Sequence, residues 1–388
     1  MNSIGSIPAG ALKIAFDDEV QIVPPGLLKR SMMSMARHPD GSIVLNTQSG
    51  PLYRSGDNGR SWTARPVDIP GQAHEQVLHG LGIGCDGRLW LSHSSAADYP
   101  DGLYGQDLFV SSSADGGRSW ATSPTDFTQV APGIPNMCFH EDGNRTFVEQ
   151  PDGTLMFTTT IVPAPAYREK YPPRAPTDYG GQPGDMFSDL VFRSTDGGAT
   201  WGDPTQVYLA LNPHESNLAL DPFDPDRILL MARCQRALTE AEDADEFMAR
   251  TGNPTPMIKQ GVLFESADGG RTFGEAGWTN YYGHRGNVYF APSNIVVVTH
   301  SNAHLDSALV ARISLDGGRT WQHGDKGATR ELLSAEKFVL VPDPPGHSFT
   351  TPTLELAPGH FLTAYGWYPD STQQLTVNGI FWHLEEAG

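Results

Sequence analysis

The chain alternates short apolar runs with tight polar turns, and long amphipathic helical patterns are scarce. Six times, two apolar runs of strand length are separated by a turn rich in Gly, Pro, Asp or Asn, which is the pattern of a β-hairpin. These hairpins occupy residues 33–46, 80–92, 147–159, 218–232, 288–300 and 354–366. The pattern predicts a protein built almost entirely from β-strands.

A second kind of turn recurs five times, each time after a further apolar run. Its form is Ser-x-Asp-x-Gly-x-(Ser/Thr)-(Trp/Phe), and its copies span residues 55–62, 113–120, 194–201, 266–273 and 314–321. The glycine can take a positive φ without steric cost, and the aspartate can accept hydrogen bonds from turn amides. We call these segments the aspartate turns. Their uneven spacing indicates one supersecondary unit that carries insertions of variable length.

Counting both kinds of turn gives five complete four-stranded units and a sixth unit that lacks its outer strand. The N-terminal stretch 11–23, "ALKIAFDDEVQIV", can supply that strand. Closing the ring in this way would remove the exposed edges of a linear array of sheets. The sequence therefore predicts one domain over residues 1–388, an all-β six-bladed β-propeller. Insertions are expected at 163–185 and at 235–256, the second containing a short helix over 238–250.

Composition narrows the range of functions. The 388 residues carry a formal net charge of −19, which disfavours binding to nucleic acid. The three cysteines are widely spaced, and no paired Cys or His motif of a zinc site occurs, so we expect no metal and no cofactor. There is no long apolar run and no signal-peptide pattern. We therefore expect no membrane partner and a cytoplasmic location.

Candidate chemistry gathers at one level of the predicted ring. Strands of a propeller blade alternate in direction, so both kinds of turn should lie on one face and the innermost strands should begin on the other. Charged and polar residues cluster near those starts: Arg30, Glu75, His79, Arg145, Glu215, Arg285, Asn287 and His347. Around a central channel they would form a concave polar site.

Five aspartate turns in a six-bladed count resemble the Asp-box repeats of the sialidase superfamily. The resemblance implies an enzyme that holds a sugar carboxylate with arginines and uses a tyrosine nucleophile activated by a glutamate. Residues 214–233, "HESNLALDPFDPDRILLMAR", resemble the fourth blade of that family. This similarity implies that Glu215 is the activating glutamate and Arg233 one of the arginines. Arg30 resembles the arginine of the first blade.

Other family positions are not matched. No arginine stands at the family's third position, and Arg285 is the candidate substitute. Where the family has Tyr-Ser-Ser, this chain has Phe349, Thr350 and Thr351. The candidate replacements for the missing tyrosine are Tyr281, Tyr282 and Tyr365. Glu75 is the candidate acid/base.

Three functions follow from these features, all with a carbohydrate partner. The first is a sialidase-like exo-glycosidase that acts on an anionic or sialic-acid-type sugar with an atypical catalytic set. The second is a polysaccharide lyase on uronate-containing glycans, in which a histidine abstracts a proton; the histidines suited to this role are His74, His79, His284 and His347. The third is a non-catalytic carbohydrate-binding propeller, because a fold alone does not confer activity.

Overall fold

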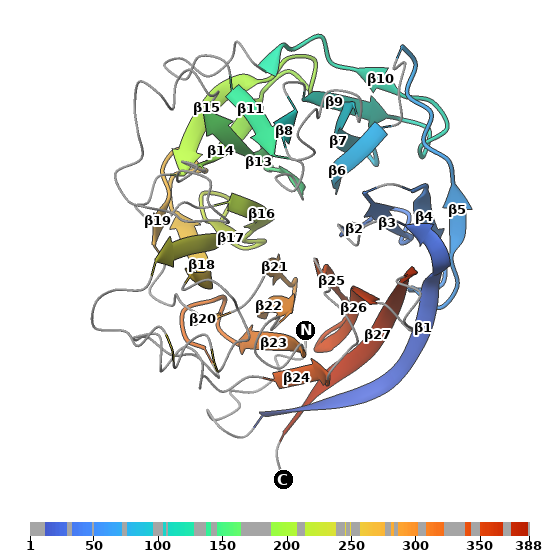
Figure 1. Cartoon of the computed structure of the whole chain (residues 1–388), viewed down its shortest axis with the longest axis vertical. Coiled ribbons are helices and arrows are strands. Elements are labelled where there is room, and N and C mark those ends of the chain that lie inside the picture. Colours follow the sequence, from blue (N-terminus) through green and yellow to red (C-terminus); the bar gives the residue numbers. More distant parts are fainter. Residues whose placement is uncertain are drawn as a thin grey trace.

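The computed structural model shows six antiparallel sheets arranged in a ring around a central axis (Figure 1). It describes residues 12–28, 33–48, 50–71, 76–95, 104–105, 108–127, 137–140, 146–163, 188–207, 214–237, 245, 249, 257–275, 281–282, 286–301, 308–321, 338–342, 350–367 and 374–386. This arrangement confirms the predicted six-bladed β-propeller.

The first three blades hold residues between positions 33 and 207. Blade 1 contains β2 (Met33–Arg37), β3 (Ile43–Thr47), β4 (Leu52–Ser55) and β5 (Thr63–Arg65). Blade 2 contains β6 (Gln76–Ile83), β7 (Leu89–Ser95), β9 (Phe109–Ser113) and β10 (Ala121–Thr122). Blade 3 contains β8 (Tyr104–Gly105), β11 (Met137–His140), β12 (Phe147–Glu149), β13 (Leu155–Pro163), β14 (Ser188–Ser194) and β15 (Gly202–Val207).

The remaining blades complete the ring. Blade 4 contains β16 (His214–Leu220), β17 (Ile228–Ala237), β18 (Met257–Ser266), β19 (Gly274–Glu275) and β20 (Tyr281–Tyr282). Blade 5 contains β21 (Asn287–Phe290), β22 (Val296–Ser301), β23 (Leu309–Ser314) and β24 (Phe338–Val341). Blade 6 contains β25 (Thr353–Ala357), β26 (His360–Trp367), β27 (Leu375–Glu386) and β1 (Leu12–Leu28). All six predicted hairpins are present, each formed by the two innermost strands of a blade.

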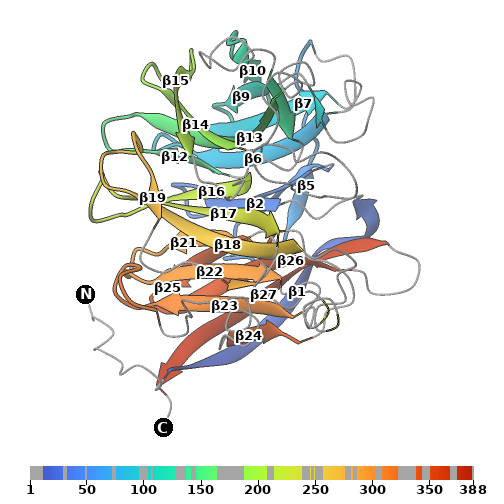
Figure 2. The same cartoon turned by 60° about the vertical axis from the view of Figure 1, so that its left-hand side comes forward.

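The N-terminal strand closes the ring, as the sequence predicts. Strand β1 pairs with β27 in an antiparallel ladder from Leu12 opposite Glu386 to Leu28 opposite Leu375. The two strands run side by side over most of their length (Figure 2). Because the first and last segments of the chain share one sheet, blade 6 forms only when both ends have come together.

The aspartate turns all follow one hydrogen-bonding scheme. In the turn of blade 3, the Ser194 hydroxyl donates to Asp196 at 2.8 Å and accepts from the Gly198 amide at 2.8 Å. The Thr200 amide and hydroxyl both donate to the same carboxylate, at 2.9 and 2.6 Å. These bonds, led by the Thr200 hydroxyl, lower the pKa of Asp196 to about 2. The same bonds recur in the turns centred on Asp57, Asp115, Asp268 and Asp316.

Each aspartate turn also packs against the preceding blade. The second glycine of the blade 3 turn, Gly198, has φ 79° and lies directly on the Trp90 ring of blade 2. The corresponding Gly270 lies against Met156 and Arg193 of blade 3. The carbonyl of Gly317 in blade 5 accepts a hydrogen bond from Arg227 of blade 4 at 2.5 Å. These turns therefore fasten neighbouring blades together at one face of the ring.

Polar side chains join the innermost strands of neighbouring blades. In each case a side-chain oxygen of one blade accepts a hydrogen bond from a backbone amide of the next blade. This bond satisfies an N–H group that the sheet itself leaves unpaired. The pairs are Ser34 with Leu81 at 2.9 Å, Thr146 with Leu218 at 2.8 Å, Asn217 with Val288 at 3.1 Å, and Thr350 with Met33 at 2.5 Å. Side-chain hydrogen bonds of this kind thus join four pairs of neighbouring blades: 1 and 2, 3 and 4, 4 and 5, and 6 and 1.

Candidate functional site

The second strand of five blades changes from apolar to polar part-way along its length. In β3, Leu45 is followed by Asn46 and Thr47; in β13, Phe157 is followed by Thr158 to Thr160. The same change follows Leu91 in β7, Ala232 in β17 and Val298 in β22. The polar residues Asn46, Thr47, Ser92, His93, Ser94, Thr158, Thr159, Thr160, Arg233, Thr299, His300 and Ser301 are all buried.

This buried polar layer lies at the end of the ring opposite the aspartate turns. The turn between the two innermost strands and the aspartate turn of a blade share one face, as shown by the bond from the Gly269 amide to the Asp226 carbonyl. The polar ends of the second strands therefore meet the starts of the innermost strands on the other face. This is the level at which the sequence predicts a site.

Glu215 and Arg233 form a buried ion pair in this layer. Arg233 Nε lies 2.6 Å from Glu215 Oε2, and the two side chains are 6% and 0% exposed. The guanidinium compensates the negative charge of a carboxylate that burial would otherwise disfavour strongly. The structure thus brings together two of the residues that the sequence predicts for the site.

The backbone at Glu215 is strained. Its φ is 58°, and the ladder between β16 and β17 is irregular between His214 and Asn217. Among the described residues, the other non-glycine positions with positive φ are Asn58, Asp203 and Asn294, and asparagine and aspartate adopt this conformation more often than other side chains. A glutamate inside a strand has no such preference. Strain of this kind is found where the surrounding structure fixes a functional side chain.

A second buried carboxylate is linked to Glu215 through Thr160. The Glu215 amide donates to Thr160 Oγ1 at 2.9 Å, and this hydroxyl donates to Asp189 Oδ1 at 2.7 Å. Asp189 lies on β14 and is fully buried. Asp189 and Thr160 are not among the site residues predicted from the sequence. The polar run 158–160 after an apolar half-strand was the signal that could have found Thr160.

His79 and Asn287 also lie in the buried polar layer. His79 occupies a bulge in β6 between Leu78 and Gly80, and its Nε2 is 2.8 Å from Ser94 Oγ. Asn287 is the first residue of β21 and is 5% exposed. Bulges occur often beside active sites, where they redirect a side chain. His79 and Glu215 thus both occupy irregular positions on innermost strands.

His93 stays neutral in this layer. Its ring stacks on Phe109, with centroids 5.5 Å apart, and its Nε2 lies 2.8 Å from Ser111 Oγ. Burial, together with the nearby His79, lowers the pKa of His93 to about 3. The layer therefore contains a neutral imidazole at neutral pH.

Tyr365 does not join Glu215 and Arg233. Its hydroxyl donates to Glu19 Oε1 at 2.5 Å, and Glu19 lies on β1, the outermost strand of blade 6. Burial and Glu19 raise the pKa of Tyr365 above its ordinary value. Tyr365, one of the candidate replacements for the missing tyrosine, therefore points toward the outermost strand of blade 6. Thr350 and Thr351 are also used structurally, by bonds to Met33 and Thr299.

Several predicted site residues lie outside the described residues: Glu75, Arg30, Arg145, Arg285 and His347. The same holds for most of the two expected insertions and for most of the helix expected at 238–250, of which Asp245 and Ala249 are described and helical. Gln235 to Ala237 belong to β17 rather than to an insertion. Among the described residues, no helix is long and apolar enough to cross a membrane.

A cavity of about 550 Å³ lies on the opposite face, between the turns of blades 3 and 4. Its lining includes Asp152, Asp203, Asp268 and Arg271. Its lining does not include Glu215, Arg233, Thr160 or Asp189. Because its walls are the aspartate turns and the neighbouring hairpin turns, we assign it to the scaffold.

The comparisons with known proteins agree with this fold. No protein-family model matches the chain. A xyloglucanase of a Paenibacillus species is 27% identical over 187 residues, and the match spans 46% of this chain but only 17% of that protein.

Solved structures resemble nearly the whole chain. A Dyadobacter fermentans protein of unknown function has a TM-score of 0.66 at 16% identity, covering 98% of this chain and 100% of that one. The α-L-arabinofuranosidase of Fusarium graminearum has a TM-score of 0.61 at 13% identity, with 94% and 97% covered. Trypanosoma rangeli sialidase has a TM-score of 0.53 at 12% identity, with 94% and 59% covered. The protein therefore has the sialidase-like six-bladed β-propeller fold that these sialidase and arabinofuranosidase structures share.

Proposed function

We propose that the protein is a glycoside hydrolase whose catalytic centre is the Glu215–Arg233 pair and the buried polar layer around it. The single observation that carries this proposal is the buried ion pair at a strained backbone position. Holding a non-glycine residue at φ 58° costs about 1–3 kcal/mol. A merely structural ion pair would not need this conformation, whereas a catalytic carboxylate must be held in one orientation.

Glu215 acts as a general base in this proposal. A carboxylate accepts a proton from a nucleophile as that nucleophile attacks the anomeric carbon. Phe349 stands where the sialidase resemblance expects a tyrosine, and Tyr365 is directed to Glu19. We therefore assign attack to a water molecule. Its oxygen bonds to the anomeric carbon as the glycosidic bond breaks, Glu215 takes the water proton, and an acid protonates the departing oxygen. Glu75 remains the candidate for that acid.

Arg233 makes an anionic sugar the preferred substrate. A guanidinium can hold a carboxylate by parallel hydrogen bonds, and the predicted Arg30 and Arg285 would add to it. Sialidases among the structural neighbours support a terminal sugar of the sialic-acid type. Arabinanase and arabinofuranosidase structures bound to arabinobiose have the same fold, so a neutral arabinoside is the second substrate to test.

A panel of fluorogenic aryl glycosides tests the proposal. The expected result is release of the aryl alcohol from an α-sialoside, with an α-L-arabinofuranoside as the neutral comparison. Cleavage of the arabinofuranoside alone would support the proposed hydrolase activity but contradict the proposed preference for an anionic sugar. Unsaturated uronates formed from polysaccharide, detected by ultraviolet absorbance, would show a lyase instead. Glycan binding without cleavage would show a carbohydrate-binding propeller.

A further inference from the structure

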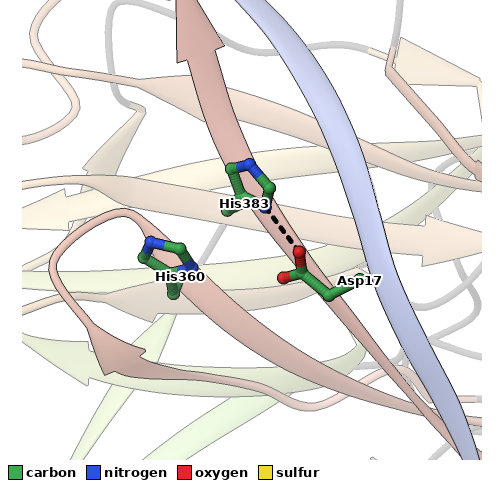
Figure 3. Close-up of side chains that lie close together, drawn as sticks. All are labelled: Asp17, His360 and His383. Carbon is green, nitrogen blue, oxygen red and sulfur yellow. Dashed lines mark ion pairs between the residues drawn. The ribbon is translucent and has the colours of Figure 1, made fainter.

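Two histidines and an aspartate converge at the outer corner of blade 6 (Figure 3). Asp17 comes from β1, His360 opens β26 and His383 lies on β27. One ligand atom from each residue lies within 4.8 Å of the other two. His383 Nδ1 is 2.9 Å from Asp17 Oδ1, and the two imidazole rings stack with centroids 4.9 Å apart.

The strand geometry brings these side chains together. His360 and His383 are directly opposite each other in the ladder between β26 and β27. On the other side, Phe16 pairs with Trp382 and Asp18 with Phe381, so Asp17 is an extra residue between two paired positions. Such a bulge redirects the side chain of the extra residue. Here the carboxylate of Asp17 reaches the imidazole of His383.

We propose that Asp17, His360 and His383 bind a zinc ion. Two imidazoles and one carboxylate form the mixed nitrogen and oxygen ligand set that zinc accepts, whereas calcium and magnesium prefer oxygen ligands alone. In a tetrahedral site with bonds of about 2.1 Å, ligand atoms lie about 3.4 Å apart. His383 Nδ1 and Asp17 Oδ1, at 2.9 Å, are slightly closer than that, and the three ligand atoms, all within 4.8 Å of one another, reach this spacing by small side-chain movements. Asp17 and His360 are exposed and His383 is half-buried, so solution metal can reach them.

Glu385 supplies the outer partner that a zinc-binding histidine usually has. His383 Nε2 lies 3.1 Å from Glu385 Oε1, two residues further along β27. A metal-bound imidazole typically donates its other N–H to a carboxylate, which fixes the tautomer and the ring orientation. When His383 Nε2–H donates to Glu385, the unprotonated Nδ1 of His383, which lies on the Asp17 side, is left to bind the metal. If His383 only formed an ion pair with Asp17, neither the nearby His360 nor the contact with Glu385 would be needed.

The site would join the two ends of the chain. Its ligands come from β1, β26 and β27, the strands by which the N-terminal segment closes the ring. The sequence predicts no metal because ligands at positions 17, 360 and 383 leave no local spacing motif. Zinc bound only by the closed ring stabilises it relative to the unfolded chain, by mass action.

Calorimetric titration of the untagged, chelator-treated full chain with zinc chloride tests this proposal. We expect one zinc ion per chain, and a rise in Tm of about 3 °C when free zinc is 100 times the dissociation constant. His360→Ala removes the side chain of an exposed residue; it should weaken zinc binding at least ten-fold and abolish the Tm rise. His38→Ala is the control, because His38 forms another surface pair, with Asp40 at 2.8 Å, without a second histidine.

Three results would overturn the proposal. They are no zinc uptake, uptake that His360→Ala leaves unchanged, and equal uptake of magnesium. The catalytic proposal does not depend on any of them, because Glu215 lies in blade 4.

Discussion

Arg233 Nε lies 2.6 Å from Glu215 Oε2 inside the propeller, where both side chains are shielded from water. The pair joins the start of β16 to the far half of β17, across an irregular step in the ladder. Thr160 of blade 3 holds the pair in place, because its hydroxyl accepts a hydrogen bond from the Glu215 amide. The orientation of this carboxylate is therefore determined by two blades together.

Removing one partner of this pair should destabilise the protein, because the other charge stays buried without compensation. Glu215→Gln and Arg233→Met should each lower the free energy of unfolding by about 3–5 kcal/mol. The double variant should recover much of that loss, which a double-mutant cycle in urea denaturation measures. Purely additive effects would show that the two side chains do not interact.

Gly198 and Gly197 provide a matched test of how the aspartate turns join the blades. Both have positive φ, 79° and 67°, so alanine is strained at each by about 1–2 kcal/mol. A Cβ at Gly198 would overlap the Trp90 ring, whereas nothing lies near one at Gly197. Gly198→Ala should therefore cost a further 1–3 kcal/mol, roughly the penalty for overpacking. Equal losses in thermal or urea unfolding would contradict the role of this contact between blades 2 and 3.

The buried His93 makes stability depend on pH. Its pKa is lowered to about 3 in the folded protein, so between pH 7 and pH 5 the unfolded chain takes up a proton that the folded chain does not. The contribution of neutral His93 to the free energy of unfolding is therefore fully present above the ordinary histidine pKa. It falls by about 2 kcal/mol as the pH drops from 7 to 5.

His93→Gln, which keeps a hydrogen-bonding side chain beside Ser111, should show a correspondingly smaller fall in urea denaturation at the two pH values. An unchanged difference between pH 7 and pH 5 would mean that His93 is protonated in the folded state. The aspartate turns do not add to this difference: the pKa of Asp196 is lowered to about 2, so the stability that its carboxylate contributes is fully present at pH 5 and pH 7 and is lost only at lower pH.

Tyr365→Phe separates a structural tyrosine from a catalytic one. The variant removes the hydrogen bond to Glu19, which keeps its bond from Asn378 at 2.7 Å. We expect a loss of about 1 kcal/mol in unfolding free energy and unchanged turnover. A fall in turnover without a change in KM would return Tyr365 to the catalytic set.

The blade pattern was predictable from sequence because each turn carries its own chemistry. The Ser, Asp and Gly of an aspartate turn are close in the chain, as are the two strands of each hairpin. Closure by β1 followed from the missing strand of the sixth unit. The resemblance of residues 214–233 to a sialidase blade implied that Glu215 and Arg233 are site residues, but it did not predict their ion pair.

Features that depend on contacts between distant segments were not predictable. The bulges at Glu215, His79 and Asp17 depend on ladder register, which sequence alternation alone does not reveal. Tyr365 was expected near the site because it ends a strand. Its partner, Glu19, lies 346 positions away on the closing strand. Asp189 was missed for a similar reason, because its link to Glu215 crosses from blade 3 to blade 4.

The most direct test compares Glu215→Gln with Asp221→Asn on the glycoside that the natural protein cleaves. Asp221 is a matched control: its carboxylate is also buried, pairs with Arg227 at 3.0 Å, and lies at the opposite end of blade 4. Both variants should lose stability, but only Glu215→Gln should lose kcat/KM, by a factor of about 10²–10⁴. Equal activity in the two variants, measured below their unfolding temperatures, would contradict the assignment of Glu215 as the catalytic base.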